Sequence, residues 1–177
     1  MNETLKNIKE RRSVRSFKPD PVPEDLLNQV IEAGLYAPSG KNHQSAVIVA
    51  ITDPELIARL SEANRKIWGK PEGVDPFFGA PAVLIVLDKA DWRNRVYDGS
   101  LVMGNLMLAA HSLGLGSCWV HRAKEEFELP EFKELLKSLG LEGEYEGIGH
   151  CVLGWPAKAN PDALPRKEGR VFLVKKY

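Results

Sequence analysis

Hydrophobic residues follow two different periods along the chain, and these periods predict a mixture of helices and strands. Within residues 24–36 the apolar positions recur every three or four residues, which is typical of an amphipathic helix. Continuous apolar, β-branched runs at 47–51 and 82–87 instead predict buried strands. The pattern as a whole predicts helices at 3–12, 24–36, 54–63, 98–114 and 124–139, and strands at 47–51, 82–87, 117–121, 150–153 and 171–174. Because helices and strands do not alternate regularly, we predict an α+β domain with helices packed around a small sheet.

Two segments depart from an ordinary amphipathic pattern. The helix predicted at 98–114 has hardly any polar face, and such helices lie at the centre of a domain or in a subunit interface. Residues 68–80 are rich in glycine and proline and predict a long loop. Long loops inside a compact domain are often functional, so this segment is a candidate part of a binding site.

The composition is that of an ordinary globular chain and argues against several classes of partner. The 177 residues include 24 Lys and Arg and 24 Asp and Glu, so the formal net charge is zero and gives no support to nucleic-acid binding. We expect no membrane partner, because no apolar run reaches the roughly 18–20 residues of a span and the N-terminus lacks the apolar segment of a secretory signal. Cys118 and Cys151 form no CxxC pair, which predicts reduced thiols and a cytoplasmic location. The length predicts a single domain, 1–177.

Several familiar catalytic motifs are missing. The glycines of 114–116 follow a helix rather than a strand, so they do not form a dinucleotide-binding fingerprint. The spacing of Cys118 from His121, and of His150 from Cys151, would place each pair on opposite faces of a strand, and no metal site is predicted. There is no GxSxG sequence for a hydrolase nucleophile, and no side chain is predicted to act as a catalytic acid or base.

A basic cluster near the N-terminus is the first candidate for binding chemistry. Arg11, Arg12 and Arg15 surround Ser13, and the planar guanidinium group is well suited to phosphate. Arg15 and Ser13 share one face if the chain is extended at this point. The alternative is a solvated helix end, where cations also interact favourably with the helix dipole.

Two further polar segments are candidates of the same kind. Asn42 and Gln44 lie in the loop between a helix and a buried strand, and their amides could read the edge of an amide-like heterocycle. Turn formation is the alternative explanation for this loop. Arg166 and Lys167 form a second basic pair in a proline-rich tail, where the alternative is an ordinary charged surface.

In combination, these segments resemble the nitroreductase family of FMN-dependent oxidoreductases. The resemblance rests on residues 11–17, 37–44, 105–119 and 153–167. Their order and spacing match the family pattern from residue 8 to the C-terminus. The resemblance implies an α+β sandwich with a small, mostly antiparallel central sheet flanked by helices. It also implies an intertwined homodimer with two FMN molecules at the subunit interface.

The resemblance further implies which residues contact the cofactor. Arg11, Ser13 and Arg15 would contact the FMN phosphate and ring, with Arg12 sharing that role, and Arg166 and Lys167 would return to the phosphate. The full set of implied FMN contacts is Arg11, Arg12, Ser13, Arg15, Pro38, Ser39, Gly40, Asn42, Gln44, Gly116, Ser117, Arg122, Arg166 and Lys167. Of these, Pro38, Ser39 and Gly40 would come from the other subunit.

One position departs from the family pattern. Many relatives carry glycines after the strand that corresponds to 117–120, where backbone amides approach the flavin, whereas this chain has His121, Arg122 and Ala123. Either a backbone contact survives, or Arg122 directs its charge at reduced flavin or at a substrate anion. Both alternatives stay open at this point.

The resemblance implies a reaction carried largely by the flavin. Hydride would pass from NADH or NADPH to flavin N5, and a small oxidised acceptor such as a nitroaromatic or a quinone would then take the same place, which predicts ping-pong kinetics. Trp68, Phe77 and Phe78 would cover the ring and bind substrate, or else form a hydrophobic plug under the loop. The alternative function is an FMN-binding protein of the same fold that serves as a flavin reductase, in flavin storage or in a non-nitro reduction.

Overall fold

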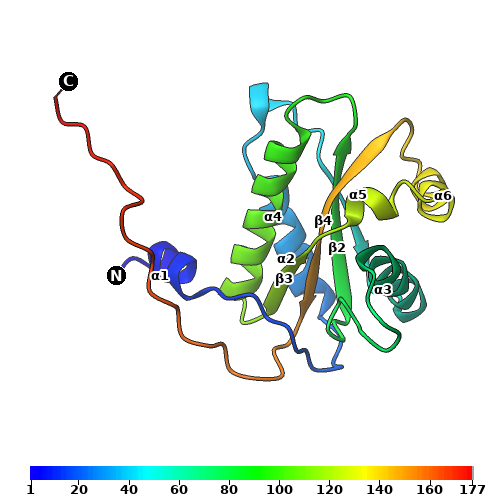
Figure 1. The fold of residues 1–177 in the computed structure, drawn as a ribbon, viewed down its shortest axis with the longest axis horizontal. Helices are drawn as coiled ribbons and strands as arrows, with labels where there is room; N and C mark the ends of the chain where they lie inside the picture. Colours follow the sequence, from blue (N-terminus) through cyan, green and yellow to red (C-terminus); the bar gives the residue numbers. More distant parts are fainter. Residues whose placement is uncertain (177) are drawn as a thin grey trace.

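A four-stranded antiparallel sheet organises the chain, whose residues 1–176 are described by the computed structural model (Figure 1). The strand order is β1-β2-β4-β3, and all three neighbouring pairs are antiparallel. The strands are β1 (Val47–Ile51), β2 (Ala82–Lys89), β3 (Gly116–Val120) and β4 (Tyr145–Gly154). The predicted α+β class with a small antiparallel sheet is therefore confirmed.

Helices cover both faces of this sheet and make three layers (Figure 1). The helices are α1 (Glu3–Glu10), α2 (Glu24–Leu35), α3 (Pro54–Trp68), α4 (Arg95–Ser112), α5 (Ala123–Glu126) and α6 (Pro130–Ser138), with a 3₁₀ turn η1 (Gly40–Asn42). Because side chains alternate along a strand, β2 serves two cores at once. Its Val83 and Ile85 pack with α3, α5 and α6, whereas Leu84 and Val86 pack with α2 and α4.

Helix α4 has one buried face and one exposed face, although its sequence is apolar nearly all round. Met103 and Leu106 are fully buried against the sheet. On the outer side Tyr97 is 72% exposed, and Val96 and Leu101 are about half exposed. Helix α4 therefore does not lie at the centre of the domain in a single chain. Its exposed apolar face instead favours the second location expected for such a helix, a subunit interface.

Two helix boundaries differ from the sequence pattern for identifiable reasons. Helix α3 continues to Trp68 instead of ending at residue 63, and Gly69 ends it with a φ of 69°. The helix predicted at 124–139 is two helices, α5 and α6, because Pro130 cannot donate a backbone hydrogen bond to a continuous helix. Smaller shifts of two or three residues affect the ends of α1 and α4.

Strand β4 is ten residues long, whereas the sequence predicts only 150–153. Glycine is uncommon in strands, and the glycines of this segment hide its first half from a pattern search. Packing explains them: a Cβ on Gly147 would come within 2.3 Å of the Ala123 backbone, and one on Gly149 within 2.2 Å of Trp119 Nε1. These glycines allow α5 and β3 to pack directly on β4.

The segment after residue 156 leaves the body of the domain as an extended, exposed tail that passes near α1 in Figure 1. The strand predicted at 171–174 is wrong, because no strand is present there and its four apolar side chains are at least 72% exposed. Within residues 1–176, no helix has both the length and the apolar character needed to cross a membrane.

Candidate functional site

Arg11 and Arg12 form a basic cluster where α1 ends. Arg12 Nη1 donates hydrogen bonds to the carbonyls of Lys9 (2.7 Å) and Arg11 (2.6 Å), so this guanidinium closes the end of the helix. Arg11 Nη1 and Arg12 Nε are buried and have no hydrogen-bond partner within residues 1–176. Buried donors without partners are rare in folded proteins, and an anionic phosphate group would satisfy them.

Ser13 continues from this cluster to the edge of the sheet. It forms an isolated parallel bridge with Ser117, and the amide of Val14 donates to the carbonyl of Ser117 at 2.9 Å. Gly116 permits this close crossing, since a Cβ there would come within 2.8 Å of the Val14 side chain. Ser117 is 2% exposed, and its hydroxyl lies beside the thiol of Cys151. Ser117 can therefore offer a ligand its backbone but not its side chain.

A small cavity of about 150 Å³ opens beside β3 and brings together residues from distant parts of the chain. Its lining consists of Arg15, Asn64, Trp68, Pro76, Phe78, Cys118, Trp119, Val120, His121 and Arg122. Four of the predicted contact residues lie here: Arg15, Trp68, Phe78 and Arg122. The lining contains two arginines and no carboxylate. These side chains are largely aromatic or cationic, and they come from four separate segments of the chain.

A tight turn at 75–80 shapes one wall of this cavity. The carboxylate of Asp75 accepts hydrogen bonds from the amides of Phe77 (2.8 Å) and Gly79 (2.6 Å), and from the hydroxyl of Ser61 (2.6 Å). Asp75 therefore fixes the backbone of the turn and ties it to α3. Nothing in the periodicity of the sequence indicates this role of Asp75.

The turn sends two adjacent phenylalanines in different directions. Phe77 is 1% exposed and packs against His150 in the core, with ring centroids 5.1 Å apart. The ring of Phe77 is therefore a core side chain, as the alternative of a hydrophobic plug under the loop predicts, and a substrate contact of Phe77 stays a prediction. Phe78 lines the small cavity with a φ of 60°, which is a strained conformation for a bulky residue.

Trp68 forms a second wall and has two cations against its ring. The guanidinium carbon of Arg122 lies 4.9 Å from the ring centroid, and the ammonium of Lys70 lies 4.6 Å from it. Both distances are those of cation–π interactions. Arg122 itself has a φ of 80°, which is uncommon for a residue other than glycine.

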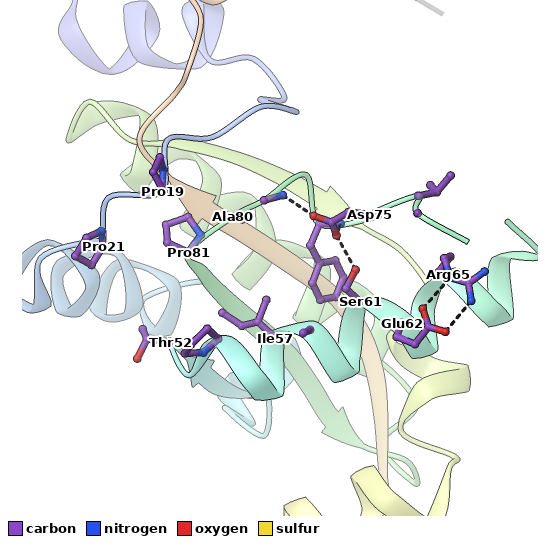
Figure 2. A pocket seen from close by; sticks show the side chains of 16 residues that line it. Pro19, Pro21, Thr52, Ile57, Ser61, Glu62, Arg65, Asp75, Ala80 and Pro81 are labelled. Carbon is purple, nitrogen blue, oxygen red and sulfur yellow. Dashed lines mark hydrogen bonds and ion pairs between the residues drawn. The ribbon is translucent and has the colours of Figure 1, made fainter. Parts of the chain in front are cut away.

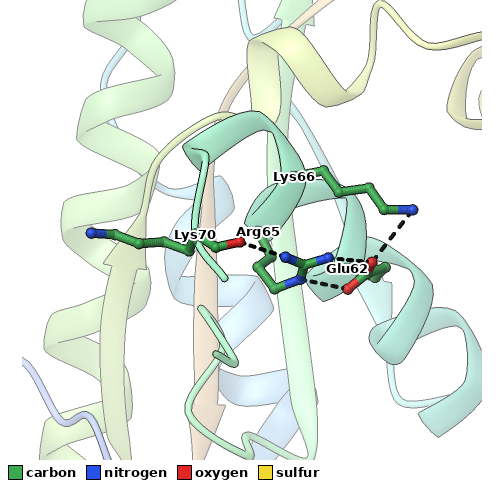
Figure 3. A network of polar contacts seen from close by, with 4 residues as sticks. All are labelled: Glu62, Arg65, Lys66 and Lys70. Atoms are coloured by element: carbon green, nitrogen blue, oxygen red, sulfur yellow. Dashed lines mark hydrogen bonds and ion pairs between the residues drawn. The ribbon is translucent and has the colours of Figure 1, made fainter. Parts of the chain in front are cut away.

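A polar network holds the end of α3 that carries Trp68 (Figure 3). Glu62 pairs with Arg65 at 2.6 Å and with Lys66 at 3.4 Å, and Arg65 also donates to the carbonyl of Lys70. The hydrogen bond from Arg65 is the main cause that lowers the pKa of Glu62 to about 2. Figure 3 shows the Lys70 side chain pointing away from this network. The network therefore fixes the backbone around Trp68 and leaves the Lys70 ammonium free of it.

The loop at 38–44 is anchored to the beginning of α4. The amide of Gly40 donates to Asp98 at 3.0 Å, and the other carboxylate oxygen of Asp98 accepts from the indole of Trp92 at 2.7 Å. His43 stacks on Trp92 with ring centroids 4.1 Å apart. Asp98 is 5% exposed, so this buried carboxylate is the attachment point of the loop.

Within the loop, Asn42 and Gln44 bond to each other rather than to another element. Gln44 Nε2 donates to Asn42 Oδ1 at 2.8 Å, and both residues are exposed with positive φ values. Pro38 and Ser39 precede them, and the hydroxyl of Ser39 accepts from the Gln44 amide at 3.0 Å. The turn alternative accounts for these contacts, and the amide groups also stay accessible to a ligand.

The loop and the basic cluster lie at opposite ends of α4 in one chain. Gly40 is bonded to Asp98 in the first turn of that helix, whereas Glu10 and His111 line a cavity at its other end. Asp98 and His111 are 13 positions apart in this helix, which corresponds to about 20 Å along the helix axis. Burial lowers the pKa of His111, and the charges of the adjacent Arg11 and Arg12 lower it further, against the effect of Glu10. One chain therefore does not bring the loop and the basic cluster into one site.

Within residues 1–176, no hydrogen bond or ion pair joins the second basic pair, Arg166 and Lys167, to the basic cluster at Arg11 and Arg12. Arg166 and Lys167 are exposed in the extended tail, and the Arg166 guanidinium bonds to the carbonyl of Leu164 two residues away. In the single chain, Arg166 and Lys167 therefore belong to an exposed tail, as the alternative of an ordinary charged surface predicts.

A buried polar group that the sequence does not indicate lies behind the small cavity. His150 Nε2 is 2.7 Å from the carboxylate of Glu126, and both side chains are fully buried. Asn64, also fully buried, donates to the carbonyl of His121 at 2.8 Å. Because His121 precedes Arg122 and Glu126 lies in the following helix, these contacts hold both ends of the segment that presents Arg122.

The two cysteines belong to the core rather than to a reactive site. Burial raises the pKa of Cys118, and it raises the pKa of Cys151 to about 12. Both thiols therefore stay protonated at neutral pH, which makes them poor nucleophiles.

A larger cavity of about 620 Å³ lies between α3, the segment around Pro19 and the turn at 75–80 (Figure 2). Its charged side chains are already paired: Glu62 with Arg65, and Asp75 with Ser61 and the turn amides. Prolines and aliphatic side chains form much of the remaining lining. This cavity is larger than the one beside β3, but its charged side chains already have partners. The small cavity therefore stays the better candidate for ligand binding.

Comparison with known proteins agrees with this fold. A model described as the nitroreductase family matches residues 8–155. An FMN reductase (NAD(P)H) of Bacillus subtilis is 29% identical over 94% of this chain and 72% of its own length. An NADPH-flavin oxidoreductase of Vibrio harveyi is 29% identical over 98% of this chain and 73% of its own. A solved nitroreductase with bound FMN from Bacteroides fragilis superposes with a TM-score of 0.87 at 31% identity and covers 99% of this chain and 100% of that one.

The matched region spans more than half of the chain, and the similarity extends to fold and sequence together. The protein belongs to the nitroreductase family. The family resemblance predicted from residues 11–17, 37–44, 105–119 and 153–167 is therefore confirmed.

Proposed function

We propose that this chain is an FMN-dependent oxidoreductase that uses NADH or NADPH to reduce a small oxidised acceptor, a nitroaromatic or a quinone. The enzyme class and the cofactor follow from family membership and from relatives named as FMN reductase and NADPH-flavin oxidoreductase. The observation that carries the proposal to this chain is the pair of buried, unpartnered arginine nitrogens beside the Ser13–Ser117 crossing. Reduced, buried cysteines suit the cytoplasmic location that we propose with it.

The residues of this site bind and orient the cofactor rather than transfer protons. Arg11 and Arg12 would hold the phosphate by charge-assisted hydrogen bonds, and the Ser13–Ser117 crossing would bring backbone groups close to it. When bound, FMN supplies the redox chemistry, accepting hydride from the nucleotide and passing electrons to the acceptor. Arg15 and Arg122 would favour negative charge at the adjacent cavity.

We propose that two chains build each site. Because the 38–44 loop and the basic cluster are separated along α4, a second chain would bring the loop to the cluster. The loop residues concerned are Pro38, Ser39, Gly40, Asn42 and Gln44. The exposed apolar side of α4 and the exposed tail with Arg166 and Lys167 supply surfaces for that association. Light scattering and heat-released flavin are expected to give a homodimer with one FMN per chain. A monomer that retains full FMN would contradict the shared site.

Replacing Arg11 by Ala is expected to weaken FMN binding about tenfold or more and to leave riboflavin binding nearly unchanged. Hydrogen bonds to a charged group contribute roughly 1.5–3 kcal/mol, and riboflavin lacks the phosphate. Arg15→Ala serves as the comparison, because Arg15 lines the small cavity and should affect both ligands to a similar degree. Titrations followed by flavin fluorescence measure all four affinities. An equal loss of FMN and riboflavin in Arg11→Ala would place Arg11 away from the phosphate.

Steady-state kinetics are expected to show that the nucleotide and the acceptor share one place. Parallel double-reciprocal plots, with inhibition by high acceptor that NAD(P)H overcomes, are the expected result. The physical reason is that the nucleotide and the acceptor would use the same open face of the bound flavin, so that each excludes the other. Intersecting plots, together with simultaneous binding of both substrates, would exclude the shared place while leaving the enzyme class intact.

A further inference from the structure

The larger cavity, between α3, the segment around Pro19 and the turn at 75–80, lies outside the proposed cofactor site (Figure 2). The described residues that line it include none of the proposed FMN contacts. Its volume of about 620 Å³ is typical of small-molecule sites, which range over roughly 300–1,000 Å³. The cavity is therefore large enough for a ligand of its own.

Apolar and conformationally restricted residues make up most of its walls. Ile57 and Ala58 come from one face of α3, and Phe77 joins the lining to the core. The lining also holds four prolines, whose rings fix the backbone φ: Pro19, Pro21, Pro54 and Pro81. Rigid walls lose little conformational entropy on binding, and a ligand that is rigid as well loses little of its own. A fused aromatic ring system is both rigid and apolar, and therefore suits these walls.

The charged side chains of the larger cavity leave no charge free for a ligand. Arg65 Nε and Nη2 donate to the carboxylate of Glu62 at 2.8 Å and 2.6 Å, and Arg65 Nη1 donates to the carbonyl of Lys70. The carboxylate of Asp75 accepts from two amides of the turn and from one hydroxyl. An ionised ligand would lose its water here without gaining an unpaired countercharge. The pairing therefore argues against a charged ligand and favours an uncharged one.

Ser61 supplies a polar contact that an uncharged ligand can use. Its hydroxyl donates its only proton to Asp75 at 2.6 Å, as Figure 2 shows, so the remaining capacity of the Ser61 oxygen is to accept. A hydroxyl on the ligand can donate to this oxygen, whereas an ether oxygen in the same place would meet only acceptors. This part of the cavity therefore selects a ligand with a hydrogen-bond donor.

We propose that the larger cavity is a second ligand site, separate from the flavin, which binds an uncharged aromatic compound with a phenolic hydroxyl. The ring system lies against Ile57 and the prolines, and the hydroxyl donates to Ser61. The proposal goes beyond the proposed function and does not depend on it, because the lining holds none of the residues assigned to the cofactor.

The test compares three naphthalenes of similar shape on the purified protein with its flavin bound. 1-Naphthol is uncharged and has the hydroxyl donor, 1-methoxynaphthalene lacks the donor, and 1-naphthoate is an anion. Equilibrium dialysis measures the affinity and the number of molecules bound per chain. The visible absorption of the flavin reports separately on any ligand that reaches the flavin, and melting curves show that each variant is folded.

Variants of the lining assign the binding to this cavity. Ala58→Trp fills the cavity from α3, and Val74→Trp fills it from the loop, where Val74 is 37% exposed. Glu55→Trp is the matched control, since it adds the same ring at an exposed position of α3 outside the lining. Ser61→Ala removes the acceptor, whereas Ser61→Thr keeps the hydroxyl.

The wild type is expected to bind one 1-naphthol per chain without a change in flavin absorption. Its affinity for 1-naphthol should exceed that for 1-methoxynaphthalene about threefold to tenfold, as expected for one neutral hydrogen bond, and 1-naphthoate should bind about tenfold or more weakly than 1-naphthol. Ala58→Trp and Val74→Trp should abolish this binding, and Glu55→Trp should retain it. Ser61→Ala should lower the 1-naphthol affinity to that of 1-methoxynaphthalene, and Ser61→Thr should keep the difference. The FMN content should stay the same throughout.

Four results would overturn the proposal: 1-naphthol binding that persists in a folded Ala58→Trp or Val74→Trp, equal wild-type affinities for 1-naphthol and 1-methoxynaphthalene, equal losses of both in Ser61→Ala, or tightest binding of 1-naphthoate. A change in flavin absorption that follows all of the 1-naphthol binding would place the ligand at the flavin instead. If one filling variant does not fold, the other decides. A wild type without FMN contradicts the proposed function, whereas 1-naphthol binding that the filling variants abolish would still support this second site.

Discussion

Replacing Glu126 by Leu is expected to lower the free energy of unfolding by about 1–3 kcal/mol, because the buried imidazole of His150 loses the polar group that faces it. The carboxylate of Glu126 and the imidazole of His150 are both fully buried and 2.7 Å apart, so the variant leaves the His150 ring facing an apolar side chain. Urea denaturation followed by circular dichroism measures the loss.

Two controls separate this effect from a general cost of mutation. The double variant Glu126→Leu, His150→Phe replaces both polar groups by apolar ones and should recover much of the lost stability. Arg59→Ala breaks an exposed ion pair with Glu131 and should cost no more than about 1 kcal/mol. If Glu126→Leu costs no more than Arg59→Ala, the buried pair does not stabilise the segment that presents Arg122.

Truncating Phe77 to Ala is expected to cost about 3–5 kcal/mol of stability, whereas truncating Phe78 should change the acceptor preference instead. Phe77 is 1% exposed and packs in the core cluster beside His150, so its removal leaves a cavity. Phe78 lines the small cavity, and its backbone has a φ of 60°. Denaturant melts and KM values for a panel of acceptors, measured on both variants, distinguish the two roles.

Phe78→Gly provides the control for strain. Glycine adopts positive φ without cost, so this variant should be at least as stable as Phe78→Ala while losing the same ring. The interpretation would be contradicted if Phe77→Ala altered the acceptor preference with little loss of stability, or if Phe78→Ala destabilised the protein as strongly as Phe77→Ala.

Much of the fold is predictable because strand and helix periods in this chain are strong and local. The apolar run of strand β2 predicts a buried strand, and the helices on its two faces have a clear helical period of apolar residues. Strand β4 is only half predicted, because Gly147 and Gly149 are present for close packing against Ala123 and Trp119. Such tertiary contacts leave no periodic trace in a sequence.

The sequence predicts those parts of the candidate site whose polar residues are neighbours in the chain. It does not predict the parts whose residues are distant in the chain and meet only in the folded structure. Arg11 and Ser13 are adjacent in the sequence, so their cluster is visible before the structure. The adjacency of Phe77 and Phe78 instead misleads, because the Asp75 turn separates their side chains. The pair of Glu126 and His150 is brought together only by the fold, since the two residues are 24 positions apart in the chain.

The exposed tail contains an aggregation-prone segment, and the basic residues on both sides of it oppose aggregation. Residues 171–174 are Val, Phe, Leu and Val, a run of high β-propensity that lies open to solvent in the single chain. Segments of this kind promote intermolecular cross-β aggregation when they stay uncovered during synthesis. Arg170 precedes the run, and Lys175 and Lys176 follow it. Charges in these flanking positions act as gatekeepers, since stacking copies of the segment in register would bring like charges together along a fibril. The basic flanks are therefore expected to disfavour such stacking of the exposed tail.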